Sequence, residues 1–392
     1  MLKKVRIGDL GEIYTGNTPS KKIEEYYESN DIMFIKPDVM SFDIKIVDKS
    51  NEYISEKARS KARIVPQNSL LVSCIGNIGK LAINKKETAF NQQVNAIVNN
   101  DNIVSSKYLA YLLKYNQKKL EAIANAPVVP IINKTQFSNF EVLIHDDLGV
   151  QKRIIEVLDK AQELINKKKD QIEQLDELVK SRFIEMFGDH VKNPKCWKYE
   201  KLENITYKIT DGKHGDCKNE DSSGYYFISA KDINDRKIYV DNARQITKVD
   251  FDETNKRTNL QVDDLVIVNT GASIGKTAIA TKEDVSKNLT FQKSVAIITV
   301  NSNILTSKFL EQYIIFDRDR IYKNASGSAQ KNWLLSQMRS YKIILPPIKL
   351  QNQFADFVDQ VDRIKLEMEN SLEELEDNFN SLMQKAFKGE LF

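Results

Sequence analysis

The sequence predicts an α+β protein made of two tandem α/β lobes and two long helices that pair with each other inside the chain. Two observations predict this fold: the sequence repeats itself at a distance of about 200 residues, and each copy changes abruptly from short β-branched runs to a long helical pattern. With 392 residues, 41% of them hydrophobic, the chain can bury two separate cores.

The repeat is clearest in two glycine-containing stretches, CIGNIGKLAI at 74–83 and TGASIGKTAI at 270–279. Each follows a short apolar run that predicts a β-strand. The stretch SKYLAYLL at 106–113 recurs as SKFLEQYI at 307–314, and Gln151 recurs as Gln351. Because the distance between matching positions drifts only slightly, we expect two copies of one fold with small insertions in the loops.

The organisation follows from this repeat. Short runs such as 44–47 and 294–298 predict strands, and 106–117 and 307–316 predict short helices. We expect four segments: a lobe at 1–149, a central helical spacer at 150–187, a second lobe at 188–349 and a C-terminal helical spacer at 350–392.

The two spacer segments carry apolar residues at steps of three and four, and neither proline nor glycine interrupts 150–187 or 350–387. This heptad-like pattern is typical of a coiled coil. Since a lone helix of this kind is not stable in water, each is expected to pack against the other, although docking of each stripe on its own lobe is an alternative. The predicted interface residues are Leu158, Ile165, Ile172, Leu175, Val179, Val361, Met368, Leu372, Leu375 and Phe379.

Composition excludes several classes of protein. The three cysteines are widely spaced and odd in number, which argues against a disulfide framework and for a reducing compartment. Cysteines and histidines show no metal-ligand spacing, so no metal is expected. The N-terminal segment lacks the apolar core of a signal peptide, and no apolar run is long enough to span a membrane.

The stretch Thr270–Thr277 resembles a phosphate-binding loop because it ends in Gly-Lys-Thr after an apolar run. The first glycine of that motif would stand at Thr270, however, and the residues that follow predict a strand instead of a helix. Without a helix N-terminus, the loop lacks the free N–H groups that hold phosphates. A glycine-containing hairpin is therefore predicted here, and a nucleotide-binding enzyme is the alternative.

Several polar, glycine-containing and basic loops of the lobes are candidates for contact with DNA. The net charge is only +3, but the positive excess lies in the lobes and the last helical segment is acidic. Amide, hydroxyl and lysine groups can read base edges or hold phosphates. The candidate DNA-binding residues are Thr15, Asn17, Ser20, Lys21, Lys36, Asn77, Lys80, Asn133, Lys134, Lys213, His214, Lys231, Ser273, Lys276, Ser328, Gln330, Lys331 and Asn332.

The ordered combination of these features resembles the specificity (S) subunit of a Type I restriction–modification enzyme. The resemblance is carried by LLVSCIGNIGKLAI and LVIVNTGASIGKTAI, by the loop SGSAQKNW, by the two long helices, and by LVKSRFIEMFGD and SLMQKAFKGELF. It covers the whole chain. The loop 326–332 matches the family well and makes Ser328, Gln330 and Lys331 the best candidates, whereas the first-copy loop 125–134 departs from it with two prolines.

The resemblance implies that the lobes are target-recognition domains, each reading one half of an asymmetric bipartite DNA site. The helices would form an antiparallel intramolecular coiled coil that sets the spacing and docks two methyltransferase (M) subunits; restriction (R) subunits are further candidate partners. The chain itself would be non-catalytic and without cofactor, with S-adenosylmethionine and ATP on partner subunits. The implied location is the cytoplasm of a prokaryote, with no membrane partner. A scaffold whose lobes bind other proteins is the remaining alternative.

Overall fold

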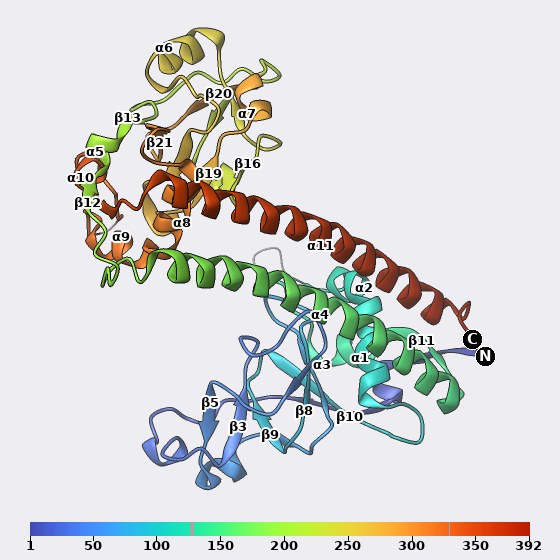
Figure 1. Ribbon diagram of the computed structural model, residues 1–392. Helices are drawn as coiled ribbons and strands as arrows, with labels where there is room; N and C mark the ends of the chain where they lie inside the picture. The colour runs from blue at the N-terminus through green and yellow to red at the C-terminus, as the bar shows by residue number, and fades with distance from the viewer. Residues whose placement is uncertain (126–128, 329) are drawn as a thin grey trace. The chain divides into compact units, whose positions relative to one another are not determined.

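The computed structural model describes residues 1–125, 129–328 and 330–392, and the chain divides into two compact units. Unit 1 comprises Met1–Lys169 and Asn370–Phe392, and unit 2 comprises Asp170–Glu369. Each unit therefore holds one lobe together with one half of each long helix, α4 (Leu148–Phe187) and α11 (Ile348–Lys388) (Figure 1). Both long helices begin two residues before the predicted start. The predicted loops 125–134 and 326–332 are only partly covered, since 126–128 and 329 lie outside the described residues.

The lobe of unit 1 is built on a mixed sheet in the order β2–β10–β7–β8–β4, beside a smaller sheet in the order β5–β3–β9–β6. The strands of the first sheet are β2 (Gly11–Thr15), β10 (Val94–Asn99), β7 (Leu70–Ser73), β8 (Leu81–Asn84) and β4 (Lys45–Val47). Those of the second are β5 (Glu52–Ile54), β3 (Ile32–Ile35), β9 (Thr88–Phe90) and β6 (Ile64–Val65). The lobe also contains the antiparallel pair β1 (Leu2–Arg6) and β11 (Glu141–His145), and the helices α1 (Ser106–Tyr115), α2 (Gln117–Ala122) and α3 (Lys134–Ser138).

The lobe of unit 2 has a main sheet in the order β13–β21–β18–β19 and a smaller one in the order β17–β14–β20. Their strands are β13 (Thr206–Asp211), β21 (Val295–Val300), β18 (Leu265–Val268), β19 (Thr277–Ile279), β17 (Arg244–Gln245), β14 (Tyr225–Ile228) and β20 (Asn288–Phe291). Further pairs are β15 (Ile233–Asn234) with β16 (Lys237–Ile238), and β12 (Tyr199–Lys201) with β22 (Lys342–Ile344). The helices are α5 (Leu202–Ile205), α6 (Lys248–Thr258), α7 (Lys282–Ser286), α8 (Ser307–Phe316), α9 (Arg318–Asn324) and α10 (Leu335–Ser340).

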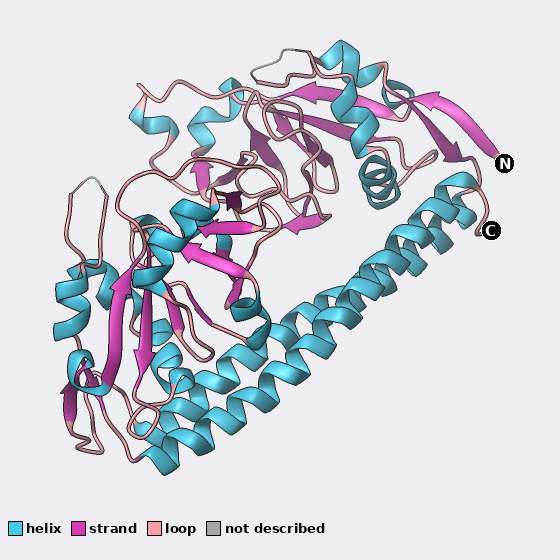
Figure 2. Cartoon of the chain, turned by 90° about the horizontal axis from the view of Figure 1, so that it is seen from above, coloured by secondary structure: helices cyan, strands magenta, loops and turns pink. Residues whose placement is uncertain are grey.

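The predicted internal repeat is confirmed, because each lobe has a main sheet, a smaller sheet and a capped short helix in the same order. In both lobes the small sheet contains one parallel pair, β3 with β9 and β14 with β20. Ser105 caps α1 and Thr306 caps α8, each accepting a hydrogen bond from a backbone N–H in the first turn. Figure 2 shows the strands confined to the lobes, while α4 and α11 run as uninterrupted helices.

A buried glutamine anchors the start of each long helix to its lobe in the same way. The amide of Gln151 donates to the carbonyl oxygens of Ile103 (2.9 Å) and His145 (2.7 Å). The amide of Gln351 donates to the carbonyls of Ile304 (3.0 Å) and Pro346 (2.8 Å). The match of these two glutamines in the sequence therefore reflects the same contact between helix and lobe in both copies.

In unit 1 the first half of α4 packs against the last half of α11. Leu158 and Ile165 of α4 share a hydrophobic core with Phe379 and Phe387 of α11 and with Tyr108 of α1. An ion pair between Lys169 and Glu376 (2.8 Å) joins the exposed edges of the two helices. The start of one helix thus meets the end of the other, and the predicted antiparallel pairing is confirmed in this unit.

In unit 2 the last half of α4 packs against the first half of α11. Phe183 and Phe187 of α4 lie 5.5 and 5.4 Å, ring centre to ring centre, from Phe354 of α11. The ring of Phe309 on α8 stacks on Phe183 at 5.5 Å. The two alternatives weighed for the apolar stripes are therefore both realised, because each helix contacts its partner helix and the lobe with the same side chains.

The predicted interface residues differ in burial. Those fully buried are Leu158, Ile165, Val179, Val361 and Phe379, and those half-buried are Ile172, Leu175, Met368, Leu372 and Leu375. Ile364, which falls three residues after Val361 in the apolar pattern of 350–387, was also expected in the stripe, and this expectation was wrong: the side chain is 44% exposed, because it lies on the outward face of α11.

Candidate nucleic-acid interface

The hairpin that resembles a phosphate-binding loop joins two antiparallel strands, β18 and β19. One 3-10 turn, Gly271–Ser273, lies between them, and Gly271 and Gly275 have φ of +75° and +83°. Glycine suits both positions because left-handed backbone is strained for residues with a Cβ atom. Because β19 stands where a phosphate-binding loop needs a helix, the hairpin interpretation is confirmed.

A second loop pairs with this hairpin in each lobe. In unit 2 the N–H of Gly271 donates to the carbonyl of Lys331 (2.8 Å), and Ser326 and Asn332 close the base of the second loop through paired backbone hydrogen bonds. In unit 1 the N–H of Gly76 donates to the carbonyl of Pro130 (2.9 Å), and Asn125 pairs with Ile131. Two loops that differ strongly in sequence therefore occupy the same position, so the architecture is shared and the surface differs.

A third loop follows the first strand of each main sheet. It passes so close to the parallel pair that a Cβ on Gly16 would lie 2.2 Å from the carbonyl oxygen of Asn91, and one on Gly212 would lie 1.9 Å from that of Phe291. Glycine is therefore required at both positions for steric reasons. This places the predicted residues 15–21 and 213–214 at equivalent positions in the two lobes.

The predicted contact residues fall into two groups by exposure. The exposed group consists of Asn17, Ser20, Lys21, Asn77, Asn133, Lys134, His214, Lys231, Ser328 and Gln330. The half-buried group consists of Thr15, Lys36, Lys80, Lys213, Ser273, Lys276, Lys331 and Asn332. The hairpin and the second loop bring together Ser273, Lys276, Gln330 and Lys331 in unit 2, whereas Lys36 and Lys231 lie on other segments.

All five half-buried lysines of the predicted set have partners within the protein. The ammonium of Lys36 pairs with Glu52, and that of Lys80 donates to the carbonyl of Pro37 (3.2 Å). The ammonium of Lys276 donates to Oδ1 of Asn234 (2.6 Å), and that of Lys331 donates to the carbonyl of Ala325 (3.0 Å). These contacts fix the lysine side chains on the surface before any ligand binds.

Lys213 has the strongest such engagement. Its ammonium lies 2.9 Å from Asp250 and 2.9 Å from Glu253, and the hydrogen bond to Asp250 raises the pKa of the lysine. The hydrogen bond from Lys213, aided by the backbone N–H of Lys218, lowers the pKa of Asp250 to about 2. Lys213 is therefore charged, but its charge is largely balanced by the neighbouring carboxylates.

Several predicted amide and hydroxyl side chains stabilise the loops that carry them. Asn17 donates to the carbonyl of Lys61 (2.6 Å) and accepts from the N–H of Arg63 (2.6 Å). Asn133 caps α3, and Thr15 donates to Asn95 (2.7 Å). His214 Nε2 lies 2.9 Å from Asp211. Their exposed edges stay candidates for DNA contact, and their internal bonds hold the loops in one conformation.

One residue that supports the interface has no signal in the sequence pattern. Arg318 of α9 donates from Nε to the carbonyl of Ile274 (2.8 Å) and from Nη2 to that of Ala272 (3.2 Å). These two hydrogen bonds fix the hairpin loop against α9. A Cβ on Gly275 would lie 2.8 Å from Arg318, which explains the glycine there. Gln117 of α2 lies against Gly79 at the equivalent position in unit 1.

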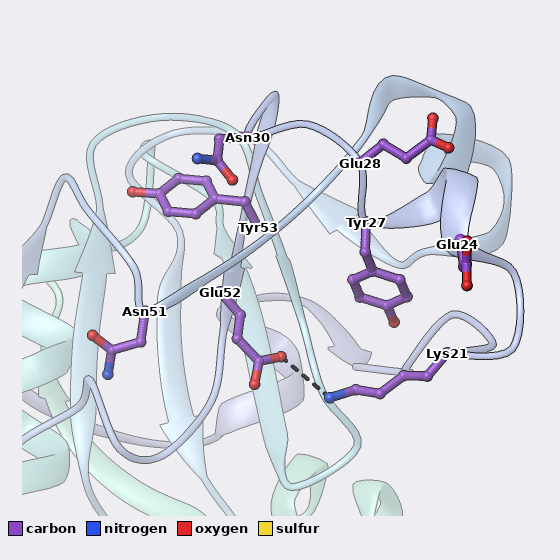
Figure 3. Close-up of a pocket in the computed structure, with 8 residues that line it drawn as sticks. All are labelled: Lys21, Glu24, Tyr27, Glu28, Asn30, Asn51, Glu52 and Tyr53. Atoms are coloured by element: carbon purple, nitrogen blue, oxygen red, sulfur yellow. Dashed lines mark ion pairs between the residues drawn. The ribbon is translucent and has the colours of Figure 1, made fainter.

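A shallow cavity of about 690 Å³ lies on the small sheet of unit 1 (Figure 3). Glu24, Glu28 and Glu52 line it together with Tyr27 and Tyr53, and Lys21 reaches toward Glu52 from the opposite side at 3.7 Å. Three carboxylates beside one ammonium are unfavourable for a phosphate group. Lys21 stays a predicted DNA contact through its exposed loop, and this cavity adds no phosphate site.

Among the described residues, no cluster of three or more His, Cys, Asp or Glu side chains has the arrangement of a metal site, and no helix has both the length and the apolar character to cross a membrane.

Comparison with known proteins identifies the family to which this duplicated architecture belongs. The family model of the Type I restriction modification DNA specificity domain matches the chain twice, at residues 2–174 and 194–377, so the chain belongs to this family. The MjaIX specificity subunit of a Type I restriction enzyme from Methanocaldococcus jannaschii is 25% identical over 414 residues, covering 98% of this chain and 92% of that protein. The EcoR124I/EcoR124II specificity subunit of Escherichia coli is 30% identical over 169 residues, 41% of each chain.

Solved structures share the fold at low sequence identity. The S subunit of a Type I restriction–modification system from M. genitalium aligns with a TM-score of 0.53 and 14% identity, covering 99% of this chain and 96% of that one. A chain from a type I R-M system, solved in a study of complex assembly and conformational transition, aligns with a TM-score of 0.60 and 14% identity over 100% and 98% of the two chains. The predicted resemblance is confirmed.

Proposed function

We propose that this chain is the DNA-specificity subunit of a Type I restriction–modification system, in which each lobe reads one half of an asymmetric bipartite DNA site. The observation that carries this proposal is that two lobes of one architecture present different side chains on the same pair of loops. Because the fold is duplicated, each lobe presents one loop surface that can contact DNA. The different side chains on the two surfaces suit two different half-sites.

The half-buried lysines support this proposal because of how they are held. A lysine whose ammonium is fixed by a carbonyl or amide oxygen keeps its positive charge, since neutral acceptors do not balance it. Lys276 and Lys331 are held in this way on adjoining loops. They are suited to phosphate contacts that place the lobe on the duplex, while Ser328 and Gln330 are free to reach base edges.

The long helices would separate the lobes and dock two methyltransferase subunits. Helices of 40 and 41 residues are each about 60 Å long at 1.5 Å per residue. Their outward faces carry exposed apolar side chains that the lobes and the partner helix leave uncovered: Leu164, Leu178 and Ile184 on α4, and Ile364 and Leu366 on α11. Such residues are suited to contact with partner helices.

The chain would act without catalysis or a cofactor of its own. S-adenosylmethionine and ATP would be bound by the methyltransferase and restriction subunits, and the complex would act on double-stranded DNA in a prokaryotic cytoplasm. The presence of β19 after Lys276 supports this assignment, because the hairpin provides no helix N-terminus for a nucleotide.

The test is to express the chain with its methyltransferase in a host without other modification systems and to sequence the modified DNA. We expect one bipartite motif with two unlike halves. The double variant Gln330→Ala and Lys331→Met should change or relax the sequence recognised in one half of the motif only. The substitution Asn77→Ala in the other lobe is its matched partner. A motif that is unchanged when the lobe loops are exchanged would refute the proposal.

A further inference from the structure

The turn between β15 and β16 has an unfavourable backbone. Asp235 and Arg236, the two residues of the turn, have φ of +48° and +59°. Such two-residue hairpin turns require positive φ at both positions and favour Asn-Gly, Asp-Gly or Gly-Gly, so Asp235 suits its position whereas Arg236 stands where glycine is preferred. A charged residue in left-handed conformation persists where surrounding contacts determine it. The contacts of the Arg236 side chain supply that determination.

The guanidinium of Arg236 joins three elements of unit 2. It donates from Nε (3.1 Å) and Nη2 (2.7 Å) to Glu311 of α8, and from Nη1 (2.7 Å) and Nη2 (3.2 Å) to Asp362 of α11. Glu311 is 1% exposed, so removal of this arginine alone would leave a buried carboxylate without its ion-pair partner. The ammonium of Lys308 completes the cluster at 2.9 Å from Asp362.

The neighbouring cations favour the ionised form of Asp362. Burial by itself raises the pKa of Asp362, but the charges of Arg236 and Lys308 outweigh it and hold that pKa below its ordinary value. Lys308 also lies 2.9 Å from Asp359 of α11. Two cations and three carboxylates therefore form a fixed joint between the lobe and the long helix α11.

The same turn contacts the predicted DNA interface. Asn234, which precedes it, accepts the hydrogen bond from the ammonium of Lys276 at 2.6 Å. Ile233 and Ile238 on the two short strands pack with Val266 and Ala278 of the hairpin strands. A continuous set of contacts therefore runs from Asp362 on the long helix through Arg236 and Asn234 to Lys276 on the hairpin loop.

Unit 1 has a different arrangement at the equivalent position. Lys80 donates to the carbonyl of Pro37, and the neighbouring Asp43 pairs with Lys114 of the short helix α1. Lys107 pairs with Asp159 of α4 at 2.6 Å. In the described part of unit 1, no ion pair runs directly from the segment 36–47 to a long helix. Both lobes thus have a lysine that pairs with a long helix, but an ion pair from the turn that contacts the hairpin lysine is a property of the second lobe.

We propose that Arg236 is a positioning residue that fixes the orientation of the second lobe on α11 and thereby determines which spacer length between the two half-sites the complex accepts. This inference rests on the proposed function. It assigns spacer discrimination in part to a joint within unit 2, in addition to the length of the helices. Lys276 transmits the position, because its ammonium is held by the residue that precedes the turn.

The test is the double variant Arg236→Met with Glu311→Gln. It removes the buried cation together with the buried carboxylate, and Asp362 keeps Lys308 as its partner, so no buried charge is left alone. The variant and the wild-type chain, each in complex with the methyltransferase, are assayed for modification of three duplexes. These carry the motif with its natural spacer, with one base pair more and with one base pair less. We expect the preference for the natural spacer to fall by about tenfold, the effect of losing one charged hydrogen bond.

A merely structural role predicts a different result, in which modification of all three duplexes falls in proportion and their ratio is unchanged. The matched control is Arg59→Met, which breaks an ion pair with Glu87 within the other lobe and should leave the spacer preference as in the wild type. The milder variant Asp362→Asn should shift the ratio in the same direction and serves if the double variant does not fold.

A folded variant, double or Asp362→Asn, that keeps the wild-type spacer preference overturns the inference and leaves the proposed function standing. If the wild-type complex shows no preference for a bipartite DNA motif, both the inference and the proposed function are overturned.

Discussion

The substitution Phe183→Ala tests whether the long helices and the second lobe form one packed body. Phe183 is fully buried, and aromatic rings of α4, α8 and α11 surround it at centre-to-centre distances of 5.0 to 5.5 Å. Truncation of a buried phenylalanine costs about 3–5 kcal/mol of unfolding free energy, and each aromatic pair adds about 0.5–1.5 kcal/mol beyond area burial. We therefore expect a loss for unit 2 near the upper end, about 4–5 kcal/mol.

The assay is urea unfolding followed by tryptophan fluorescence. Both tryptophans, Trp197 and Trp333, lie in unit 2, so their signal reports this unit separately from unit 1. The matched control is Ile184→Ala, the next residue on α4, which is 50% exposed. Its expected loss is below about 1 kcal/mol, the usual range for partly exposed positions.

The comparison decides between two pictures of the helices. If α4 is only a linker that rests loosely on the lobe, both substitutions should have similar small effects. A loss below about 1 kcal/mol for Phe183→Ala, within the range of surface substitutions, would refute the packing argument and weaken the assignment of the helices as a fixed spacer.

Three further outcomes are expected. Insertion of one heptad between Lys169 and Asp170 and of another between Glu369 and Asn370, the borders of the two units, lengthens each helix by about 10 Å. If the helices set the spacing, the modified motif should gain about three base pairs of spacer, and an unchanged spacer on sequencing would rule this out. Lys331→Met should weaken DNA binding and lower the slope of log affinity against log salt by about one if it contacts phosphate; an unchanged slope in a binding titration would exclude the contact. Asp250→Asn should lower stability at pH 7, and the difference from the wild type should vanish as pH falls from 3.8 toward 2, because the folded pKa of Asp250 is depressed to about 2. A pH-independent difference in unfolding free energy would contradict the role of its ion pair with Lys213.

The repeat made most of the fold predictable. Gln151 and Gln351 matched in the sequence, and both anchor a long helix to its lobe. The helix bounds followed from the apolar period because a stripe at steps of three and four can be buried only by a helix. The small sheets with their parallel pairs were not predicted, since strands of two to four residues carry too little periodicity to be recognised.

The candidate interface was predictable in its loops and much less so in its residues. The sequence shows that positions 213 and 276 are lysines. It does not show that two carboxylates balance the charge of Lys213, whereas the neutral amide of Asn234 accepts a hydrogen bond from Lys276. Arg236 and Arg318 gave no signal at all, because their partners Glu311, Asp362 and the carbonyl of Ile274 are distant in the chain.

The sequence by itself determined that the chain is a duplicated fold with two helices built to pair, because repetition and periodicity are local properties of the order of residues. Only the tertiary structure decided which charges are balanced, which glycines are required by a close neighbour, and that the same phenylalanines bind both the partner helix and the lobe. Those properties depend on distances between residues far apart in the chain, which packing sets and which no local pattern records.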